Sequence, residues 1–166
     1  RQVLARLAPT RAARLAKAPT EREQGFLDAV ETLWGEGEWR DNRVAYMEAM
    51  QRLYERYPDD DEVATFTAVA TLSAARAMND RSSRYEVRAG AIALKVFAKN
   101  PNHPGAPHYA IHAFDDPTHA PLALLSALRY AEIAPAVARA AMESGVAARP
   151  IADFDAYLAS EPQAEP

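Results

Sequence analysis

The sequence predicts an all-α protein made of stacked antiparallel helix pairs. Alanine, leucine, glutamate and arginine are abundant and only six of the 166 residues are glycine, a composition that favours helices. Apolar residues recur three and four positions apart, and no stretch alternates apolar and polar residues between hairpin turns. Similar residues also recur at fixed distances before several prolines, which indicates a repeated helical unit.

The signals for helix starts and ends place the individual helices. Thr20 and Glu23 form a capping-box pattern that predicts the start of a helix, and the glycines after Trp34 predict its end. Pro58 ends the next helix, and the aspartates that follow it can cap another. After the helix that begins at Thr20, further helices are predicted over about 41–57, 62–78, 83–99, 103–115 and 117–133.

The helix ends repeat with a recognisable period. Small and apolar residues recur 5, 8 and 12 positions before Pro58, Pro101 and Pro135, and the last two prolines are 34 residues apart, which is the tetratricopeptide period. Because one helix pair alone leaves an apolar face uncovered, such pairs stack. Residues 1–166 are therefore predicted to form a single tetratricopeptide-like (TPR-like) domain, a right-handed α-solenoid. It would comprise about three helix pairs, a basic N-terminal helix and a C-terminal capping helix, as a fragment of a longer solenoid.

The two ends of the chain have separate expected roles. Residues 1–20 carry five basic side chains and no acid, whereas the remaining residues carry 14 basic and 23 acidic side chains. We expect the first segment to dock on its neighbour through its apolar residues; the alternative is a basic arm that binds an acidic partner. The tail 150–158 is expected to cap the last helix pair. The apolar residues concerned are Val3, Leu4, Leu7 and Leu15 at the first end and Phe154, Tyr157 and Leu158 at the second.

Composition excludes several classes of function. No second basic patch and no known motif supports nucleic-acid binding. No apolar run approaches the ~20 residues that a membrane-spanning helix needs, and the absence of cysteine excludes disulfides and thiolate metal ligands. The sequence predicts a soluble protein of the cytoplasm or the periplasm, and no oligomeric state follows from it.

The side chains best suited to metal binding or proton transfer are concentrated in one segment. All four histidines lie within the seventeen residues 103–119. On the predicted helix, His108, His112 and Asp115 are at positions i, i+4 and i+7 and share one face, and His119 could fold back to them. These four residues are a candidate site for a divalent metal such as Zn, Cu or Fe, and His103 is expected in the preceding turn.

A structural role for the same residues is the alternative. Apolar residues alternate with the histidines, so a half-buried imidazole can bond a backbone carbonyl or an aspartate without any metal. Asp116 has the position of a helix cap. No nucleophile or general base accompanies the histidine pair in a recognisable motif, so we assign no catalytic residue and no firm cofactor.

The residues from Asn100 to Pro135 resemble a family of bacterial tetratricopeptide-repeat proteins. The resemblance is carried by Asn-Pro-Asn-His-Pro-Gly-Ala-Pro-His-Tyr-Ala-Ile-His-Ala-Phe-Asp-Asp-Pro-Thr-His-Ala-Pro-Leu and by the later Arg-Tyr-Ala-Glu-Ile-Ala-Pro. It extends more loosely upstream to about Leu4. Members of that family are longer and helical throughout. They usually carry a second histidine motif where this chain has Ala138, Ala141 and Gly145, so the resemblance implies the fold far better than a complete site.

Two functions follow as hypotheses. The first is a TPR-like scaffold that binds a peptide or protein partner in a concave groove lined by the first helices of the pairs. The second is a metal-binding protein, or a metal-dependent hydrolase or oxidoreductase, that uses the segment His103–His119. The groove candidates are His108, Tyr109, His112, Phe66 and Thr65, and the metal candidates are His108, His112, Asp115 and His119.

Overall fold

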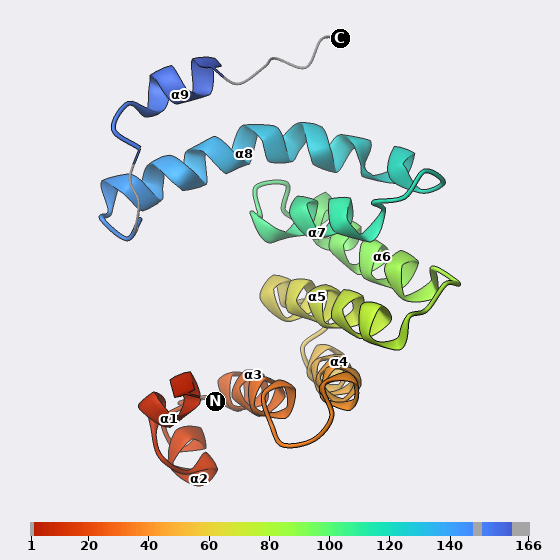
Figure 1. The fold of residues 1–166 in the computed structure, drawn as a ribbon, viewed down its shortest axis with the longest axis vertical. Coiled ribbons are helices and arrows are strands. Elements are labelled where there is room, and N and C mark those ends of the chain that lie inside the picture. The colour runs from red at the N-terminus through yellow and green to blue at the C-terminus, as the bar shows by residue number, and fades with distance from the viewer. Residues whose placement is uncertain (1, 148–150, 161–166) are drawn as a thin grey trace.

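The computed structural model describes residues 2–147 and 151–160, and these are all-α without a β-strand. Figure 1 shows the helices following one another along the long axis of a curved molecule, with the N-terminal helices at one end and α8 and α9 at the other. The elements are α1 (Gln2–Leu7), α2 (Arg11–Leu15), α3 (Glu21–Leu33), α4 (Trp39–Arg56), α5 (Asp61–Met78), α6 (Arg84–Lys99), α7 (Gly105–Ala113), the 3-10 helix η1 (Ala120–Ala123), α8 (Leu124–Glu143) and α9 (Phe154–Ser160).

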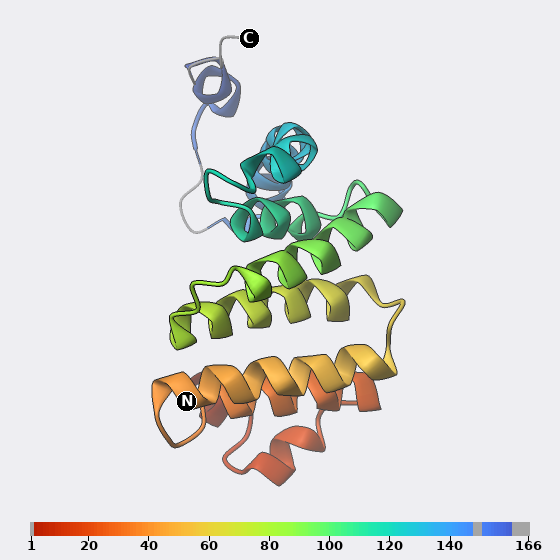
Figure 2. The ribbon, with the colours of Figure 1, turned by 90° about the vertical axis from the view of Figure 1, so that its right-hand side faces the viewer.

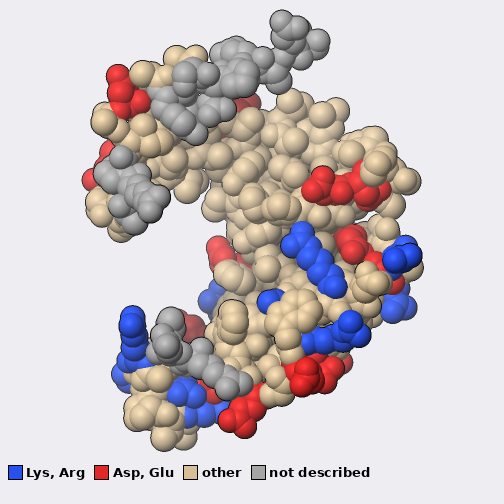
Figure 3. Space-filling model, viewed as in Figure 1, with Lys and Arg blue, Asp and Glu red and all other residues tan. Residues whose placement is uncertain are grey.

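Each helix from α3 to α7 packs chiefly on the helices before and after it in the chain. Figure 2 shows α4, α5 and α6 lying one above another and running in alternating directions. The space-filling view is hollowed on the side that lies between the N-terminal helices and the far end of α8, and it shows acidic and basic side chains interspersed (Figure 3). The chain thus forms a layered, curved array of helices.

The predicted helix starts are confirmed where local capping sets them. Thr20 accepts a hydrogen bond from the Glu23 amide and the Glu23 carboxylate accepts one from the Thr20 amide, which completes the capping box of α3. Asp60 caps α5 by accepting a hydrogen bond from the Val63 amide at 2.9 Å. α3, α4, α5 and α6 begin and end within two residues of the predicted positions.

The predicted helix 117–133 is wrong at both ends. After α7 the chain makes a turn and η1, and α8 then continues through Pro135 to Glu143. A proline inside a helix lacks one amide donor and normally kinks or ends the helix. α8 nevertheless continues through Pro135 to Glu143. The residue that suggested a 34-residue period therefore does not mark a helix end.

The core is built around α5, whose buried residues are mostly alanine and threonine. Small side chains let α4 and α6 pack closely on opposite sides of α5, and α7 contacts α5 as well. The Thr67 hydroxyl donates a hydrogen bond to the carbonyl of Val63 in its own helix and lies 3.1 Å from the carbonyl of Met50 in α4. A buried hydroxyl that bonds backbone carbonyls avoids the cost of an unpaired polar group.

The basic N-terminal segment docks on α3 through ion pairs, and Leu7, one of the apolar residues expected to make this contact, is 41% exposed. Arg14 of α2 forms an ion pair of 2.6 Å with Glu31 of α3 and donates to the carbonyl of Ala8, and Arg11 pairs with Asp28. The segment comprises two short helices instead of the single helix expected. The side chain of Val3 lies outside the described residues.

At the other end, Phe154 brings α9 into contact with α8. Phe154 is buried, and the Arg139 guanidinium of α8 lies 5.2 Å from its ring centroid and 2.6 Å from the Asp155 carboxylate. Phe154 thus contacts the last long helix, and the expected capping role of the tail stays a prediction. Pro150 and the side chains of Tyr157 and Leu158 lie outside the described residues.

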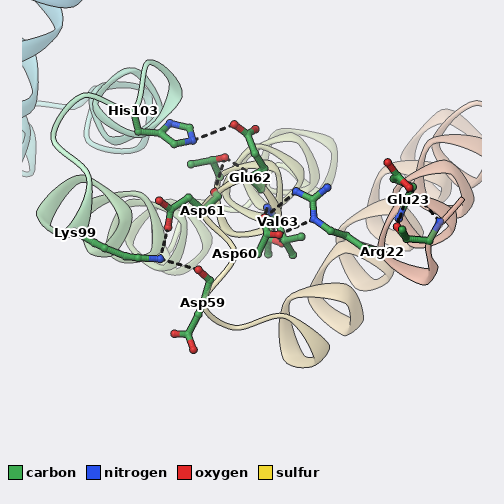
Figure 4. A network of polar contacts seen from close by, with 12 residues as sticks. Arg22, Glu23, Asp59, Asp60, Asp61, Glu62, Val63, Lys99 and His103 are labelled. Carbon is green, nitrogen blue, oxygen red and sulfur yellow. Dashed lines mark hydrogen bonds and ion pairs between the residues drawn. The ribbon is translucent and has the colours of Figure 1, made fainter. Parts of the chain in front are cut away.

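A run of four acids between α4 and α5 joins four parts of the stack (Figure 4). We call residues 59–62 the acidic corner. Asp60 is bound by two nitrogens of Arg22 from α3, at 2.6 and 3.0 Å. Lys99 at the end of α6 bonds Asp61 at 2.8 Å and the carbonyl of Asp59 at 2.7 Å, and His103 lies 3.4 Å from Glu62.

The acidic corner predicts a measurable pH dependence. The hydrogen bond from Arg22 lowers the pKa of Asp60 against the opposing effect of burial, and the Val63 amide lowers it further. A carboxylate with a lowered folded-state pKa stabilises the fold above its ordinary pKa of 3.8, and the stabilisation is lost as pH falls through the folded-state pKa.

Asp60→Ala should therefore lower the free energy of unfolding at pH 7 by about 1–3 kcal/mol, because it removes both the helix cap and the ion pair. Asp60→Asn should lose less, since asparagine can cap, and its difference from wild type should shrink below about pH 4. Urea denaturation measures both. Asp59→Ala is the matched control and should cost under about 0.5 kcal/mol; an equal loss in the control would contradict the assigned role of Asp60.

Candidate functional site

One stripe of α5 remains open to solvent. The stripe residues recur three and four positions apart, so they share one helix face, and most of the helix on either side of them is buried against α4, α6 and α7. It contains an acid, two apolar residues, a hydroxyl and an arginine, namely Glu62, Phe66, Val69, Ser73 and Arg76. Over most of its length, α5 is therefore exposed to solvent only along this stripe.

A pocket of about 380 Å³ lies over the second half of the stripe. We call it the central pocket; it is lined by Trp39 and Arg43 of α4, Val69, Leu72, Ser73 and Arg76 of α5, and Tyr109 and His112 of α7. A hollow of about 280 Å³ between α3 and α4 shares Trp39 and Arg43 with it. Another of about 250 Å³, beside α6 and the end of α7, shares Leu72, Arg76 and His112. We call the three together the α5 groove.

The central pocket has a cationic wall. The Arg43 guanidinium donates a hydrogen bond of 2.5 Å to the Ser73 hydroxyl and lies 4.6 Å from the Trp39 ring centroid. Its Nε is buried and has no hydrogen-bond partner among the described residues. Arg76 is exposed. Among the described residues, neither Arg43 nor Arg76 forms an ion pair with a carboxylate.

Aromatic side chains from α7 form the opposite side. The His108 ring lies 4.6 Å from the His112 ring, 5.5 Å from Tyr109 and 4.9 Å from Tyr130 of α8, between centroids. Burial, followed by the charge of His112, lowers the pKa of His108. Burial also raises the pKa of Tyr109, with further increases from Glu62 and Tyr130. Near pH 7 His108 and Tyr109 are therefore both neutral.

The structure brings some of the predicted groove residues together and separates others. Tyr109 and His112 line the central pocket, whereas His108 faces Tyr130. Phe66 is 41% exposed on the α5 stripe and contacts Phe26 edge-on. Thr65 is wrong as a groove residue: it is 1% exposed and its hydroxyl bonds the carbonyls of Asp61 and Glu62. Phe66, the next residue, is exposed instead, because a shift of one position along the helix moves a side chain from the buried side to the open stripe.

Six of the eight residues of the central pocket were not predicted from the sequence, among them Trp39, Arg43 and Arg76. Trp39 and Arg43 are one turn apart at the start of α4, two residues before and two after the predicted helix start. Arg76 looks like an ordinary solvated arginine. The helical spacing of Trp39 and Arg43 was a usable signal, but their approach to Ser73 depends on how α4 packs on α5.

The four candidate metal ligands do not form one cluster. α7 ends at Ala113, so Asp115 lies beyond the helix and not one turn along its face. His119 does not return to His108 and His112; its Nδ1 lies 2.7 Å from the Asp116 carboxylate. The described residues contain no group of three or more histidine or acidic side chains arranged to hold a metal ion. Only the pair His108 and His112 is close enough to act together.

Asp116 and His103 hold the two ends of the histidine segment. Asp116 accepts hydrogen bonds from the amides of Thr118 and His119, at 2.8 and 3.1 Å, as expected of a cap. His103 is 7% exposed, and its Nδ1 accepts hydrogen bonds from the amides of Gly105 and Ala106, both at 3.1 Å. It therefore caps α7, and Nε2 is the nitrogen that carries the hydrogen and faces Glu62.

Gly90 fixes how closely α6 approaches the end of α7. A methyl group at this position would overlap the ring of Phe114, which is itself 3% exposed. Phe114 ends α7 and lies 6.3 Å from the His119 ring, between centroids. Gly90 is thus needed for close packing at the corner that carries Asp116 and His119.

Gly90→Ala should destabilise the fold, although alanine is the better helix former by about 1 kcal/mol, because overpacking a core costs about 1–3 kcal/mol. In a Phe114→Leu background the same substitution should cost less, with a coupling of about 0.5 kcal/mol or more. Chemical denaturation of the four proteins of this cycle measures the coupling. Additive effects would show that Phe114 does not set the spacing.

Comparison with known proteins gives short matches only. No protein-family model and no solved structure matches the chain significantly. A stretch of 27 residues is 82% identical to the NADP-dependent malic enzymes of Salmonella typhimurium and Escherichia coli, and covers 16% of this chain but 4% of each enzyme. A stretch of 26 residues is 85% identical to the NAD-dependent malic enzyme of Rhizobium meliloti, over 3% of its length. Such short matches assign no activity. None of the described helices is long and apolar enough to span a membrane.

Proposed function

We propose that the protein is a TPR-like right-handed α-solenoid that binds a peptide segment of a protein partner in the α5 groove. The observation that carries the proposal is the open stripe of α5, whose second half lies under the central pocket lined by α4, α5 and α7 and borders the hollow beside α6. α5 and α7 would be the first helices of their pairs, and they supply six of the eight residues of the central pocket, while Trp39 and Arg43 come from α4. The resemblance of residues 100–135 to bacterial tetratricopeptide-repeat proteins supports the same proposal.

The side chains of the groove suit peptide recognition. Tryptophan, tyrosine and arginine are the residue types that most often dominate binding energy at protein interfaces. The central pocket contains Trp39 and Tyr109 as well as Arg43 and Arg76. Val69 and Leu72 supply apolar surface beside them. The groove thus combines large aromatic contacts with groups that can orient a peptide.

The proposed stack also accounts for the apolar surface of α8. Several of its leucines are exposed, among them Leu125 at 73% and Leu128 at 60%. In a solenoid each unit leaves an apolar face that a further unit or a capping segment covers. An exposed face of α8 is therefore in keeping with an array of stacked pairs. This face is also a second surface to which a peptide could bind, so it serves as a control for binding in the groove.

Peptides selected from a random displayed library on this protein should bind the α5 groove. Trp39→Ala should weaken the selected peptides by about 30-fold, because truncating an interface tryptophan commonly costs about 2 kcal/mol. Leu128→Ala is the matched control, since Leu128 is 60% exposed and Trp39 is 59% exposed; it should leave affinity unchanged. Fluorescence anisotropy measures both. The proposal fails if no peptide is selected, or if the control weakens binding as much as Trp39→Ala.

The pair His108 and His112 supports a second candidate function, binding of a divalent metal ion. Their rings are 4.6 Å apart, and the lowered pKa of His108 keeps its imidazole neutral near pH 7, which is the form that binds metal. Two imidazoles one turn apart can share a zinc ion whose bonds to nitrogen are ~2 Å long. This alternative uses two of the four residues proposed from the sequence.

Zinc titration followed by calorimetry tests this alternative. We expect one ion per chain, with binding weakened at least about tenfold by His112→Ala because one of two ligands is removed. His119→Ala is the control and should have no effect, since His119 pairs with Asp116. Absence of stoichiometric binding, or an equal loss in both variants, would reject the metal function.

A further inference from the structure

Two arginines of the central pocket, Arg43 and Arg76, form no ion pair with a carboxylate among the described residues. The residues that line this pocket include Arg43 and Arg76 and no aspartate or glutamate. Elsewhere basic side chains near the core have carboxylate partners, as Arg22 has Asp60 and Arg14 has Glu31. Because a carboxylate ligand would meet two guanidinium groups without displacing an internal partner, the pocket is prepared for an anion.

The position of Arg43 strengthens this point. Its guanidinium is held by the Ser73 hydroxyl on one side and by the face of Trp39 on the other, so it has a fixed place in the pocket wall. Its Nε is buried without a hydrogen-bond partner among the described residues. A buried donor without a partner is costly, so the fold leaves the hydrogen-bonding capacity of this guanidinium incompletely satisfied.

The surroundings restrict the size and charge of the anion. Val69 and Leu72 place apolar surface next to the arginines. Beyond Arg76 the groove becomes acidic, with Glu86, Asp115 and Asp116 around the neighbouring hollow. A ligand with many negative charges along its length would be repelled there, whereas one isolated carboxylate with an adjacent apolar side chain fits both regions.

We infer that the central pocket recognises a single carboxylate of the bound peptide through Arg43 and Arg76, while Val69 and Leu72 contact an apolar side chain next to it. This inference rests on the proposed peptide-binding function and names its ligand chemistry. The carboxylate belongs to a glutamate or aspartate side chain or to the C-terminus of the peptide. Arginine binds such a group with charge-assisted hydrogen bonds, which are stronger than neutral ones.

Three synthetic pools of hexapeptides separate these sources. The first is acetylated and amidated with glutamate at the third position and mixed neutral and apolar residues elsewhere. The second replaces that glutamate by glutamine, and the third is the glutamine pool with a free C-terminal carboxylate. Binding to the intact chain is measured by titration, together with the nuclear magnetic resonance signals of the arginine Nε–H groups.

We expect at least one carboxylate pool to bind about tenfold or more tightly than the neutral glutamine pool, with shifts in the arginine side-chain signals. If the glutamate pool binds more tightly, the carboxylate is that of a side chain; if the pool with a free C-terminus does, it is the terminal carboxylate. Arg76→Gln should reduce the preference to less than about twofold, and Arg43→Lys should weaken it while keeping a positive charge. Arg52→Gln, an exposed arginine of α4 that lines none of the three hollows, should keep it.

Other outcomes overturn the inference in distinguishable ways. Equal binding of all three pools, weakened by Trp39→Ala, would leave the groove function intact and remove the carboxylate site. A preference that persists in both Arg76→Gln and Arg43→Lys would place acid recognition elsewhere on the surface. If none of the pools binds while library-selected peptides do, the inference is again wrong and the peptide-binding function stands.

Discussion

Close packing of α5 is the constraint on which the rest of the structure depends. Its buried positions carry mainly alanine and threonine, so the axes of α4 and α6 can approach it without large side chains between them. Threonine serves here because its hydroxyl bonds a carbonyl within the helix, as Thr71 does with Thr67. Larger residues would separate the layers and open the array. Since α5 is covered by its neighbours over most of its surface, the remaining stripe becomes the floor of the groove.

The acidic corner complements this packing by fixing the ends of the helices. Asp60 is bound to Arg22 of α3, Asp61 to Lys99 of α6, and Glu62 lies near His103 before α7. Three consecutive acids thus contact three different segments around the start of α5. The core alone would permit small rotations of one layer on another, because small apolar surfaces are not strongly directional. The ion pairs that α3 and α6 form with the start of α5 restrict such rotations.

The sequence predicted what local interactions determine. The capping box of Thr20 and Glu23 and the cap at Asp60 involve residues three apart, so the starts of α3 and α5 could be predicted. The sequence predicts a helix end at Pro135 because proline normally kinks or ends a helix, but α8 continues through it to Glu143. The metal cluster failed because α7 ends where Phe114 turns into the core against Gly90, and this contact directs Asp115 and His119 away from His108 and His112.

The groove itself could be predicted only in part, because its charged wall is assembled from separate helices. Tyr109 and His112 share a face of one helix, whereas the approach of Arg43 to Ser73 joins residues thirty positions apart. Partial burial of a guanidinium without a carboxylate opposes folding, and packing in the core offers no compensation for it beyond one hydroxyl and one aromatic face. The same arginine is held in place within a pocket that also contains Arg76 and no acid. A charge that costs the fold free energy, and is nevertheless held in a defined position, is better explained by a ligand that binds it than by its contribution to stability.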